Sequence, residues 1–166
     1  MSDPLTYAER RAAVEWLASQ SYDALRVRRA WAQQRSALVR GSGPRFDTVR
    51  MPALLVRRAA GARDRKSIQA ALAEHGITTA VLADGWPRVY YALIPPGTRE
   101  QCGQWGVPGV ECLTPTCRVP LPAPSRTELP GAHWVLPAPA GPDALCDPGS
   151  LRQFLSASLG APHEHC

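Results

Sequence analysis

Residues 79–94 read TAVLADGWPRVYYALI and decide the fold. Two runs rich in aliphatic and aromatic residues, 79–83 and 86–94, flank the dipeptide Asp84-Gly85. Strong β-formers on both sides of an Asp-Gly pair are typical of a β-hairpin, because glycine accepts the positive φ that a tight turn needs. The PPGT of residues 95–98 then ends the second run. The sequence therefore predicts an antiparallel hairpin here.

Shorter strands and several helices surround this hairpin. Further β-rich stretches occur at 45–51, 110–113, 118–121 and 133–136. Capping residues or a first-turn proline precede apolar stripes at five places, so helices are predicted to begin at Thr6, to span 23–35, and to begin at Pro52, Ser67 and Asp147. A chain of 166 residues is long enough for one well-buried core, and we do not expect two. Because hairpins outnumber crossovers, we expect an α+β fold, a mostly antiparallel mixed sheet with helices packed against it.

The basic residues are concentrated in the first part of the sequence. Residues 1–66 hold 14 of the 19 lysines and arginines and six of the 14 acids, and only Lys66 is a lysine. The arginine bias fits a GC-rich genome, and the polarity fits either a solvated helical surface or a face that attracts a polyanion. No stretch approaches the roughly 20 apolar residues of a membrane span, and residues 1–20 lack the apolar centre of a signal peptide. We therefore expect a cytoplasmic protein without a membrane partner.

Few residues have the spacing of a metal site. Cys112 and Cys117 resemble half of a zinc site, but their spacing is loose and a second pair would have to come from distant cysteines or the C-terminal tail. No DxD, DxE or HExxH motif occurs. Asp47 and Glu111 lie in predicted strands, where each is either an exposed strand residue or part of a functional site.

Arginines and aromatic residues at regular spacing are candidates for nucleic-acid contacts. Trp86, Arg88 and Tyr90 alternate along one predicted strand, so its face can stack bases beside phosphate contacts. The same alternation fits a strand whose face packs against helices. Arg26 and Arg29 lie three residues apart on one exposed face of the predicted helix 23–35.

Several dispersed segments resemble a known family. They are RFDTVRMP at 45–52, VLADGWPRVYYALIPPGT at 81–98, WGVPGVECLTPTCRVPLPAPS at 105–125 and HWVLPAP at 133–139. Through them, residues from about 37 to 155 resemble the short primase/polymerase-like proteins (Prim-Pol, of the archaeo-eukaryotic primase type) that are common in actinobacteria. The resemblance implies a primase/polymerase-like core.

The resemblance also implies where a metal site would lie and how it has changed. Active members of the family hold a pair of divalent metals with a DxD-like strand and a later acid, and a histidine contacts the nucleotide. Asp47 matches the first acid, but Val49 stands at the second, and Val89 holds the place of the histidine. Glu111 matches the later acid, while Arg50 brings positive charge. If the two remaining carboxylates converge on a cleft floored by Arg50, the old site survives as a binding pocket; if they point apart, it is lost.

The expected function is binding of nucleic acid or nucleotide, with single-stranded DNA as a candidate, by a catalytically inactive primase/polymerase-like domain that is accessory or regulatory in DNA metabolism. The expected phosphate contacts are Arg26, Arg29, Arg45, Arg50 and Arg88, with Trp86 and Tyr90 as stacking surfaces. Two alternatives stay open: a protein-interaction module that uses a proline-rich surface at 120–142, and a weakly active metal-dependent primase/polymerase. No cofactor is expected, except Mg²⁺ or Mn²⁺ if the remnant site is active. The expected parts are an arginine-rich helical region at 1–36, a primase/polymerase-like domain at 37–160 and a tail at 161–166.

Overall fold

The computed structural model describes residues 5–85, 87–98 and 105–159. Its centre is a five-stranded sheet in the order β5-β2-β4-β3-β7, and a second sheet pairs β1 with β6. The strands are β1 (Ala37–Arg40), β2 (Asp47–Pro52), β3 (Val81–Asp84), β4 (Val89–Ile94), β5 (Glu111–Cys112), β6 (Arg118–Leu121) and β7 (His133–Trp134). Every pair of neighbouring strands in the described residues is antiparallel. The expected α+β class, with antiparallel sheets, is confirmed.

The hairpin expected around Asp84 is formed by β3 and β4. The two strands pair from Val81 opposite Ala92 to Asp84 opposite Val89. The second strand begins at Val89 rather than at residue 86, so the turn is wider than an Asp-Gly pair alone would give. Pro87 explains the difference, because it has no N–H to donate to the ladder.

Three of the helices begin after the caps that the sequence indicates, at Thr6, Asp23 and Asp147. Pro52 ends a strand and precedes its helix, and the helix expected from Ser67 begins two residues earlier, at Arg65, because Asp64 caps it by accepting from the N–H of Ser67. In the described residues the helices are α1 (Tyr7–Ala18), α2 (Ala24–Ala32), α3 (Ala53–Ala60), α4 (Arg65–Glu74) and α6 (Pro148–Ser156), with short 3₁₀ turns at Pro142–Ala144 and Ala157–Leu159.

The predicted capping box is present at Thr6, whose hydroxyl accepts from the N–H of Glu9 at 3.1 Å while the Glu9 carboxylate accepts from the N–H of Thr6 at 3.0 Å. Asp23 and Asp147 cap α2 and α6 with their carboxylates, which accept from the N–H groups of Arg26 and Ser150.

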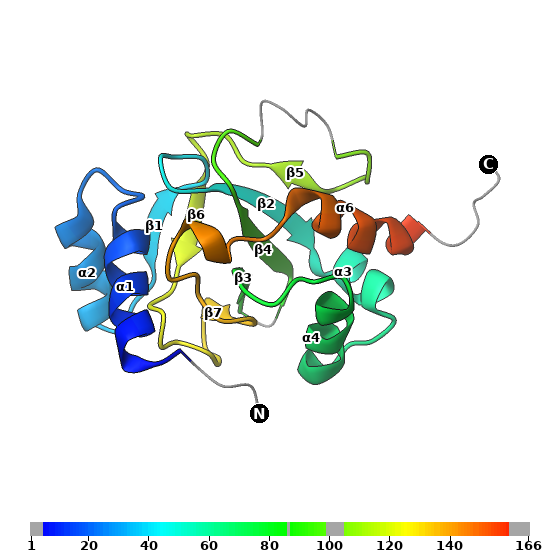
Figure 1. The fold of residues 1–166 in the computed structure, drawn as a ribbon, viewed down its shortest axis with the longest axis horizontal. Helices are drawn as coiled ribbons and strands as arrows, with labels where there is room; N and C mark the ends of the chain where they lie inside the picture. Colours follow the sequence, from blue (N-terminus) through cyan, green and yellow to red (C-terminus); the bar gives the residue numbers. More distant parts are fainter. Residues whose placement is uncertain (1–4, 86, 99–104, 160–166) are drawn as a thin grey trace.

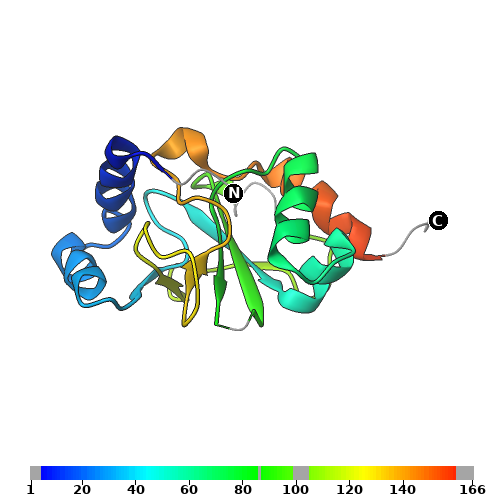
Figure 2. The ribbon, with the colours of Figure 1, turned by 90° about the horizontal axis from the view of Figure 1, so that it is seen from below.

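Both faces of the central sheet are covered. All six residues of β4 are buried, and they alternate between two hydrophobic cores. Helices α3, α4 and α6 supply the core on one face. Helices α1 and α2 and the β1–β6 sheet supply the core on the other. Figures 1 and 2 show the central sheet between these two groups of elements, which gives a molecule of three layers.

One strand was not predicted. β1 is four residues long, and its partner β6 is distant in the sequence, with Ala37 opposite Leu121. Local patterns do not reveal such a pairing, because the strand is stabilised by its partner and by the core beneath it. No helix of the described residues is long and apolar enough to cross a membrane.

Candidate polyanion-binding surface

Asp47, the first of the two expected remnant acids, is buried at the start of β2. Only 2% of the surface of Asp47 is exposed. Ser42 donates its hydroxyl to Asp47 Oδ1 at 2.7 Å, and the two residues also form a backbone bridge. Because side chains alternate along a strand, Asp47 lies on the same face as Val49 and Met51, the face covered by α3, α4 and α6. Its carboxylate therefore holds the loop that leads into β2.

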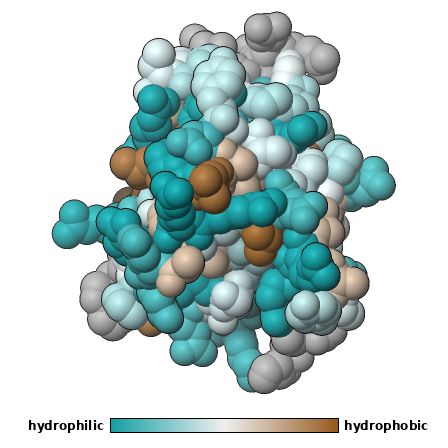
Figure 3. All heavy atoms as spheres, turned by 90° about the vertical axis from the view of Figure 1, so that its left-hand side faces the viewer, coloured by the Kyte–Doolittle hydropathy of each residue, from teal (hydrophilic) through white to brown (hydrophobic). Residues whose placement is uncertain are grey.

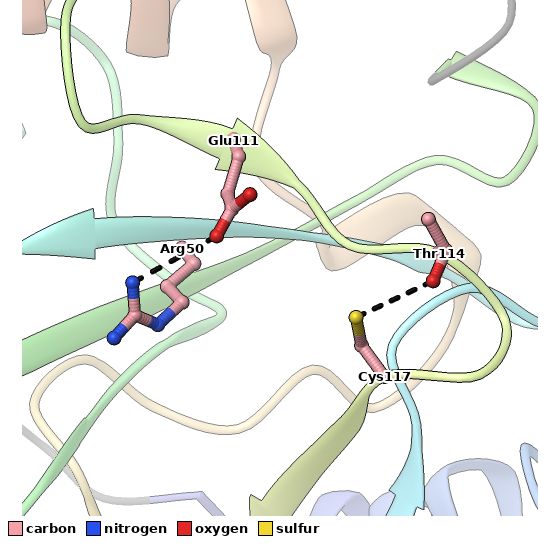
Figure 4. Close-up of polar contacts among 4 residues, drawn as sticks. All are labelled: Arg50, Glu111, Thr114 and Cys117. Carbon is pink, nitrogen blue, oxygen red and sulfur yellow. Dashed lines mark hydrogen bonds and ion pairs between the residues drawn. The ribbon is translucent and has the colours of Figure 1, made fainter.

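Glu111, the second expected remnant, lies on the opposite face. In the β2–β5 ladder it pairs with Arg50, which follows Asp47 by three residues and so points the other way. Glu111 Oε2 lies 3.8 Å from Arg50 Nη1, with 61% and 44% of the two side chains exposed (Figure 4). Carboxylates on opposite faces of a sheet cannot ligate one ion or line one cleft. A shared cleft floored by Arg50 is therefore not formed: the two carboxylates point apart, which is the second of the two outcomes that the sequence left open.

Cys112 and Cys117, the weak zinc candidates, have local partners. Trp105 donates its indole N–H to Cys112 Sγ at 2.9 Å, and Thr114 donates its hydroxyl to Cys117 Sγ at 3.3 Å (Figure 4). The Cys117 carbonyl accepts from the N–H of Gly41 at 2.8 Å. Within the described ranges, no group of three or more His, Cys, Asp or Glu side chains is placed to hold a metal ion.

Tyr90, the β4 residue of the expected stacking face, is not on the surface. Tyr90 is 4% exposed and belongs to the core beneath α3, α4 and α6, where burial raises the pKa of its hydroxyl. β4 is a central strand covered on both faces, so the expectation of an exposed Tyr90 ring is wrong. Arg88 is exposed in the turn before β4, and Trp86 lies outside the described residues.

The turn between α1 and α2 is organised by a buried glutamine. Gln20 is fully buried and uses both ends of its amide. Its Nε2 donates to the carbonyls of Arg40 and Phe46 at 3.1 and 3.0 Å, and its Oε1 accepts from the N–H groups of Arg45 and Phe46 at 2.9 and 3.2 Å. A Cβ at Gly43 would lie 2.8 Å from the Gln20 amide, so glycine permits this approach. The loop before β2 is thereby fixed against the end of α1.

Tyr22 and Arg40 meet on the outer surface of this turn. Tyr22 is 92% exposed, and Arg40 Cζ lies 4.0 Å from the centroid of its ring, within the range of a cation–π contact. Arg40 Nε also donates to the carbonyl of Gln20 at 3.4 Å. Because Arg40 covers only one side of the ring, the rest of the exposed aromatic surface is open to a ligand.

Arg26 and Arg45 flank the same turn. Arg26 Nη2 donates to the carbonyl of Leu38 at 2.8 Å and to Ser21 Oγ at 3.3 Å, and Arg45 Nε donates to Ser19 Oγ at 2.7 Å. Both arginines are exposed. Since each guanidinium has five N–H donors, most donors remain for a ligand. We call the set of Tyr22, Arg26, Arg40 and Arg45 the arginine–tyrosine cluster.

The cluster carries the positive charges of Arg26, Arg40 and Arg45. No carboxylate of the described residues lies within 4.0 Å of the guanidinium nitrogens of its arginines. Asp23, next to Tyr22 in the sequence, accepts from the N–H of Arg26 at 3.0 Å as the cap of α2. Arg118 adds a further cation, because it pairs with Arg40 in the β1–β6 ladder. Figure 3 shows this end of the molecule, where hydrophilic side chains predominate and hydrophobic ones are scattered among them.

The structure brings together some of the predicted contacts and separates others. Arg26 and Arg45 join the cluster, and Arg29 is exposed one turn further along α2. Arg50, on β2, forms an ion pair with Glu111 of β5. Arg88 lies beside the end of β2, where Pro52 pairs with Val89. Arg45 lies just before the start of the same strand, and a strand of six residues separates the two arginines by about 20 Å. Tyr22, Arg40 and Gln20 were not predicted as site residues, because only the β1–β6 pairing and the loop before β2 bring them into place.

Comparison of the chain with protein-family models, with curated proteins and with solved structures finds no match. The resemblance to primase/polymerase-like proteins therefore stays a prediction. The functional proposal rests on the residues of the arginine–tyrosine cluster and on their geometry.

Proposed function

We propose that this protein is a non-catalytic, primase/polymerase-like domain that binds single-stranded DNA through the arginine–tyrosine cluster, in an accessory role in DNA metabolism in the cytoplasm. The observation that supports it best is the contact between Arg40 and the exposed ring of Tyr22. Arg26 and Arg45 donate hydrogen bonds to Ser21 and Ser19 of the same turn, so they lie on either side of this contact. Exposed aromatic rings beside arginines are the elements with which proteins hold single strands.

Each part of the cluster has a role in such binding. The guanidinium groups offer planar donors to phosphate oxygens and draw the polyanion to this end of the molecule. The ring of Tyr22 offers a surface on which an unpaired base can stack, which duplex DNA does not present in the same way. The combination therefore favours single strands over duplexes.

The cluster is also partly preorganised. Hydrogen bonds from Arg26 and Arg45 to Ser21 and Ser19 hold both side chains in position before a ligand arrives. Gln20 fixes the backbone of the loop that carries Arg45. Because less side-chain entropy is lost on binding, each new phosphate contact gains more affinity.

The absence of catalysis in this proposal is supported by the positions of the two acids. Asp47 is buried beneath one face of the sheet and Glu111 is exposed on the other. Chemistry with a pair of metal ions needs several carboxylates that converge. Binding through cations and a ring needs no metal, so the proposal includes no cofactor.

The alternative of a protein-interaction module depended on an apolar surface at residues 120–142. Most apolar side chains of this segment are buried, among them Leu121, Pro122 and Pro124. Trp134 is also buried and donates its indole N–H to the carbonyls of Pro122 and Ala123 at 3.2 and 3.1 Å. Much of the apolar surface on which this alternative relied is therefore part of the core, which weakens its support.

The proposal is tested by fluorescence anisotropy with a labelled single strand of about 12 nucleotides, a length within the site size of small single-strand binders. If the three arginines of the cluster each contact one phosphate, a plot of the logarithm of the binding constant against the logarithm of the salt concentration should have a slope of about −2. Single strands give a slope of about −0.7 for each phosphate contact. A duplex of the same length is expected to bind more weakly. No binding at low salt would overturn the proposal.

A further inference from the structure

A groove with a volume of about 600 Å³ lies between the start of α1, the start of α4 and the segment that surrounds β7. Leu5, Leu136 and Pro137 are among its apolar lining residues, and Arg10, Arg65 and Lys66 are its cations. The volume lies within the range of about 300–1,000 Å³ that is typical of small-molecule sites. An apolar lining with a few charged groups is also typical of such sites.

Hydrogen bonds between the elements hold the groove in shape. Arg65 donates from Nη1 to the carbonyl of Thr127 at 2.5 Å and from Nη2 to the carbonyl of Trp134 at 2.7 Å. Gln69 Nε2 donates to the carbonyl of Val135 at 2.7 Å. These bonds tie the first turns of α4 to the opposite wall, so the groove does not depend on a ligand to form.

Among the described residues, no ion pair neutralises the cations of the groove. Lys66 is exposed and has no hydrogen-bond or ion-pair partner among the described residues, and Arg10 makes one long bond, from Nη2 to the carbonyl of Leu5 at 3.3 Å. Glu128 also lines the groove, but no described carboxylate lies within 4.0 Å of the nitrogens of Arg10, Arg65 or Lys66. Among the described lining residues, three cations against one acid leave an excess of two positive charges beside an apolar surface.

We propose that this groove binds a small organic phosphate monoester with an apolar body. A phosphate monoester carries a charge of about −1.5 to −2 at pH 7, which matches the excess charge of the groove. The apolar body would cover the lining residues such as Leu5 and Leu136, while Arg10 and Lys66 bind the phosphate oxygens. A phosphodiester of DNA carries a single charge at each unit and meets this requirement less well.

The groove is separate from the arginine–tyrosine cluster. It lies at the start of α1, whereas the cluster surrounds the turn that follows the end of α1. Twelve helical residues separate the two places by about 18 Å. The groove is therefore a second site, independent of the proposed binding of DNA.

The test is a titration of the full chain with phenyl phosphate, monitored by ¹H–¹⁵N chemical shifts. Phenol and inorganic phosphate, the apolar part and the charged part of this probe, are titrated separately as controls. We expect phenyl phosphate to bind at least about tenfold more tightly than either part, because apolar burial and charge contribute together. The shifts should concentrate at groove residues such as Gln69 and Leu136. Equal binding of phenyl phosphate and inorganic phosphate, or shifts spread over the surface, would overturn the proposal.

Single substitutions of the groove cations test which side chains bind the phosphate group. Lys66→Gln and Arg10→Gln are each expected to weaken phenyl phosphate about fivefold, because each removes one charge-assisted contact at a partly solvated site. Arg65 is left unchanged, since its bonds to Thr127 and Trp134 support the groove. Arg58→Gln, on the exposed side of α3, removes the same charge elsewhere and is expected to have no effect. If Lys66→Gln and Arg58→Gln weaken binding equally, the site does not exist as proposed.

Discussion

Asp47 and Glu111 project from opposite faces of the five-stranded sheet, and the position of Arg50 shows why. Arg50 lies opposite Glu111 in the β2–β5 ladder and three residues after Asp47 on β2. One acid is therefore part of a buried polar contact, and the other is part of an exposed ion pair. Their separation explains why the two carboxylates should contribute to stability in different ways.

Replacing each acid by alanine should give clearly different losses of stability. Asp47→Ala should lower the free energy of unfolding by about 1–3 kcal/mol, because it leaves the hydroxyl of Ser42 without its buried acceptor. Glu111→Ala should cost less than about 1 kcal/mol, since an exposed ion pair contributes little. Urea denaturation of both variants measures the difference. Equal losses would show that Asp47 is not held as described.

Gln20 should be among the polar residues that matter most for stability. Gln20→Ala removes four hydrogen bonds from a fully buried amide, and we expect a loss of at least about 2 kcal/mol. Gln153→Ala, on the exposed side of α6, is the matched control and should stay within about 0.5 kcal/mol of the parent. The comparison is again made by urea denaturation. A Gln20→Ala protein as stable as the control would contradict the role of this side chain.

The protein should lose stability at alkaline pH. Burial raises the pKa of the Cys146 thiol to about 12 from its usual value of 9, and it also raises the pKa values of Tyr90 and Tyr91. Above pH 9 the unfolded chain loses the thiol proton while the folded chain keeps it, so the free energy of unfolding falls as pH rises. One such group contributes a slope of at most about 1.4 kcal/mol per pH unit.

Cys146→Ala isolates the thiol in this measurement. The variant should be less stable at neutral pH, because a buried side chain is shortened, but its stability should fall less steeply between about pH 9 and 11. Denaturation curves recorded at several pH values give both slopes. Parallel slopes for parent and variant would show that Cys146 ionises equally easily in the folded and unfolded chains.

The sequence predicted most of the fold because its signals are local. The Asp84-Gly85 turn, the capping box at Thr6 and the cap at Asp147 each act within a few residues, and the elements that they mark are present. Tyr90 shows the limit of such patterns. Alternation along a strand indicates which residues share a face, but it does not say that both faces of β4 are covered, which depends on helices far away in the sequence.

The candidate site was less predictable than the fold. Arg26 and Arg45 were predicted as phosphate contacts, but the buried amide of Gln20, which fixes the loop that carries Arg45 beside this turn, gives no local signal. Tyr22 and Arg40 were not singled out, since an exposed tyrosine in a turn and an arginine at the end of an unpredicted strand carry no local signal. The pairing of β1 with β6 places Arg40 at this surface, and no motif in the sequence encodes that pairing.

The ring of Tyr22 should contribute to the affinity for single-stranded DNA. Tyr22→Ala removes the proposed stacking surface and should weaken binding by about five- to 160-fold, the range expected for one base on one aromatic side chain. Tyr7 provides the control, because it is also exposed (73%) and also lies near an arginine, with Arg11 Cζ 5.9 Å from its ring, but at the other end of α1. Tyr7→Ala should bind like the parent. Equal losses in both variants would exclude stacking at Tyr22.

The central claim is that the arginine–tyrosine cluster binds single-stranded DNA, and two charge-matched double variants test it most directly. Arg40→Gln with Arg45→Gln removes two cluster cations, and Arg58→Gln with Arg63→Gln removes two exposed cations outside the cluster. Anisotropy at several salt concentrations gives affinity and salt slope for each protein. The cluster variant should bind at least about tenfold more weakly, with a slope smaller by about 1.4, while the control keeps the slope of the parent. Equal losses of affinity and slope in the two variants would contradict the claim, because binding would then depend on net charge alone.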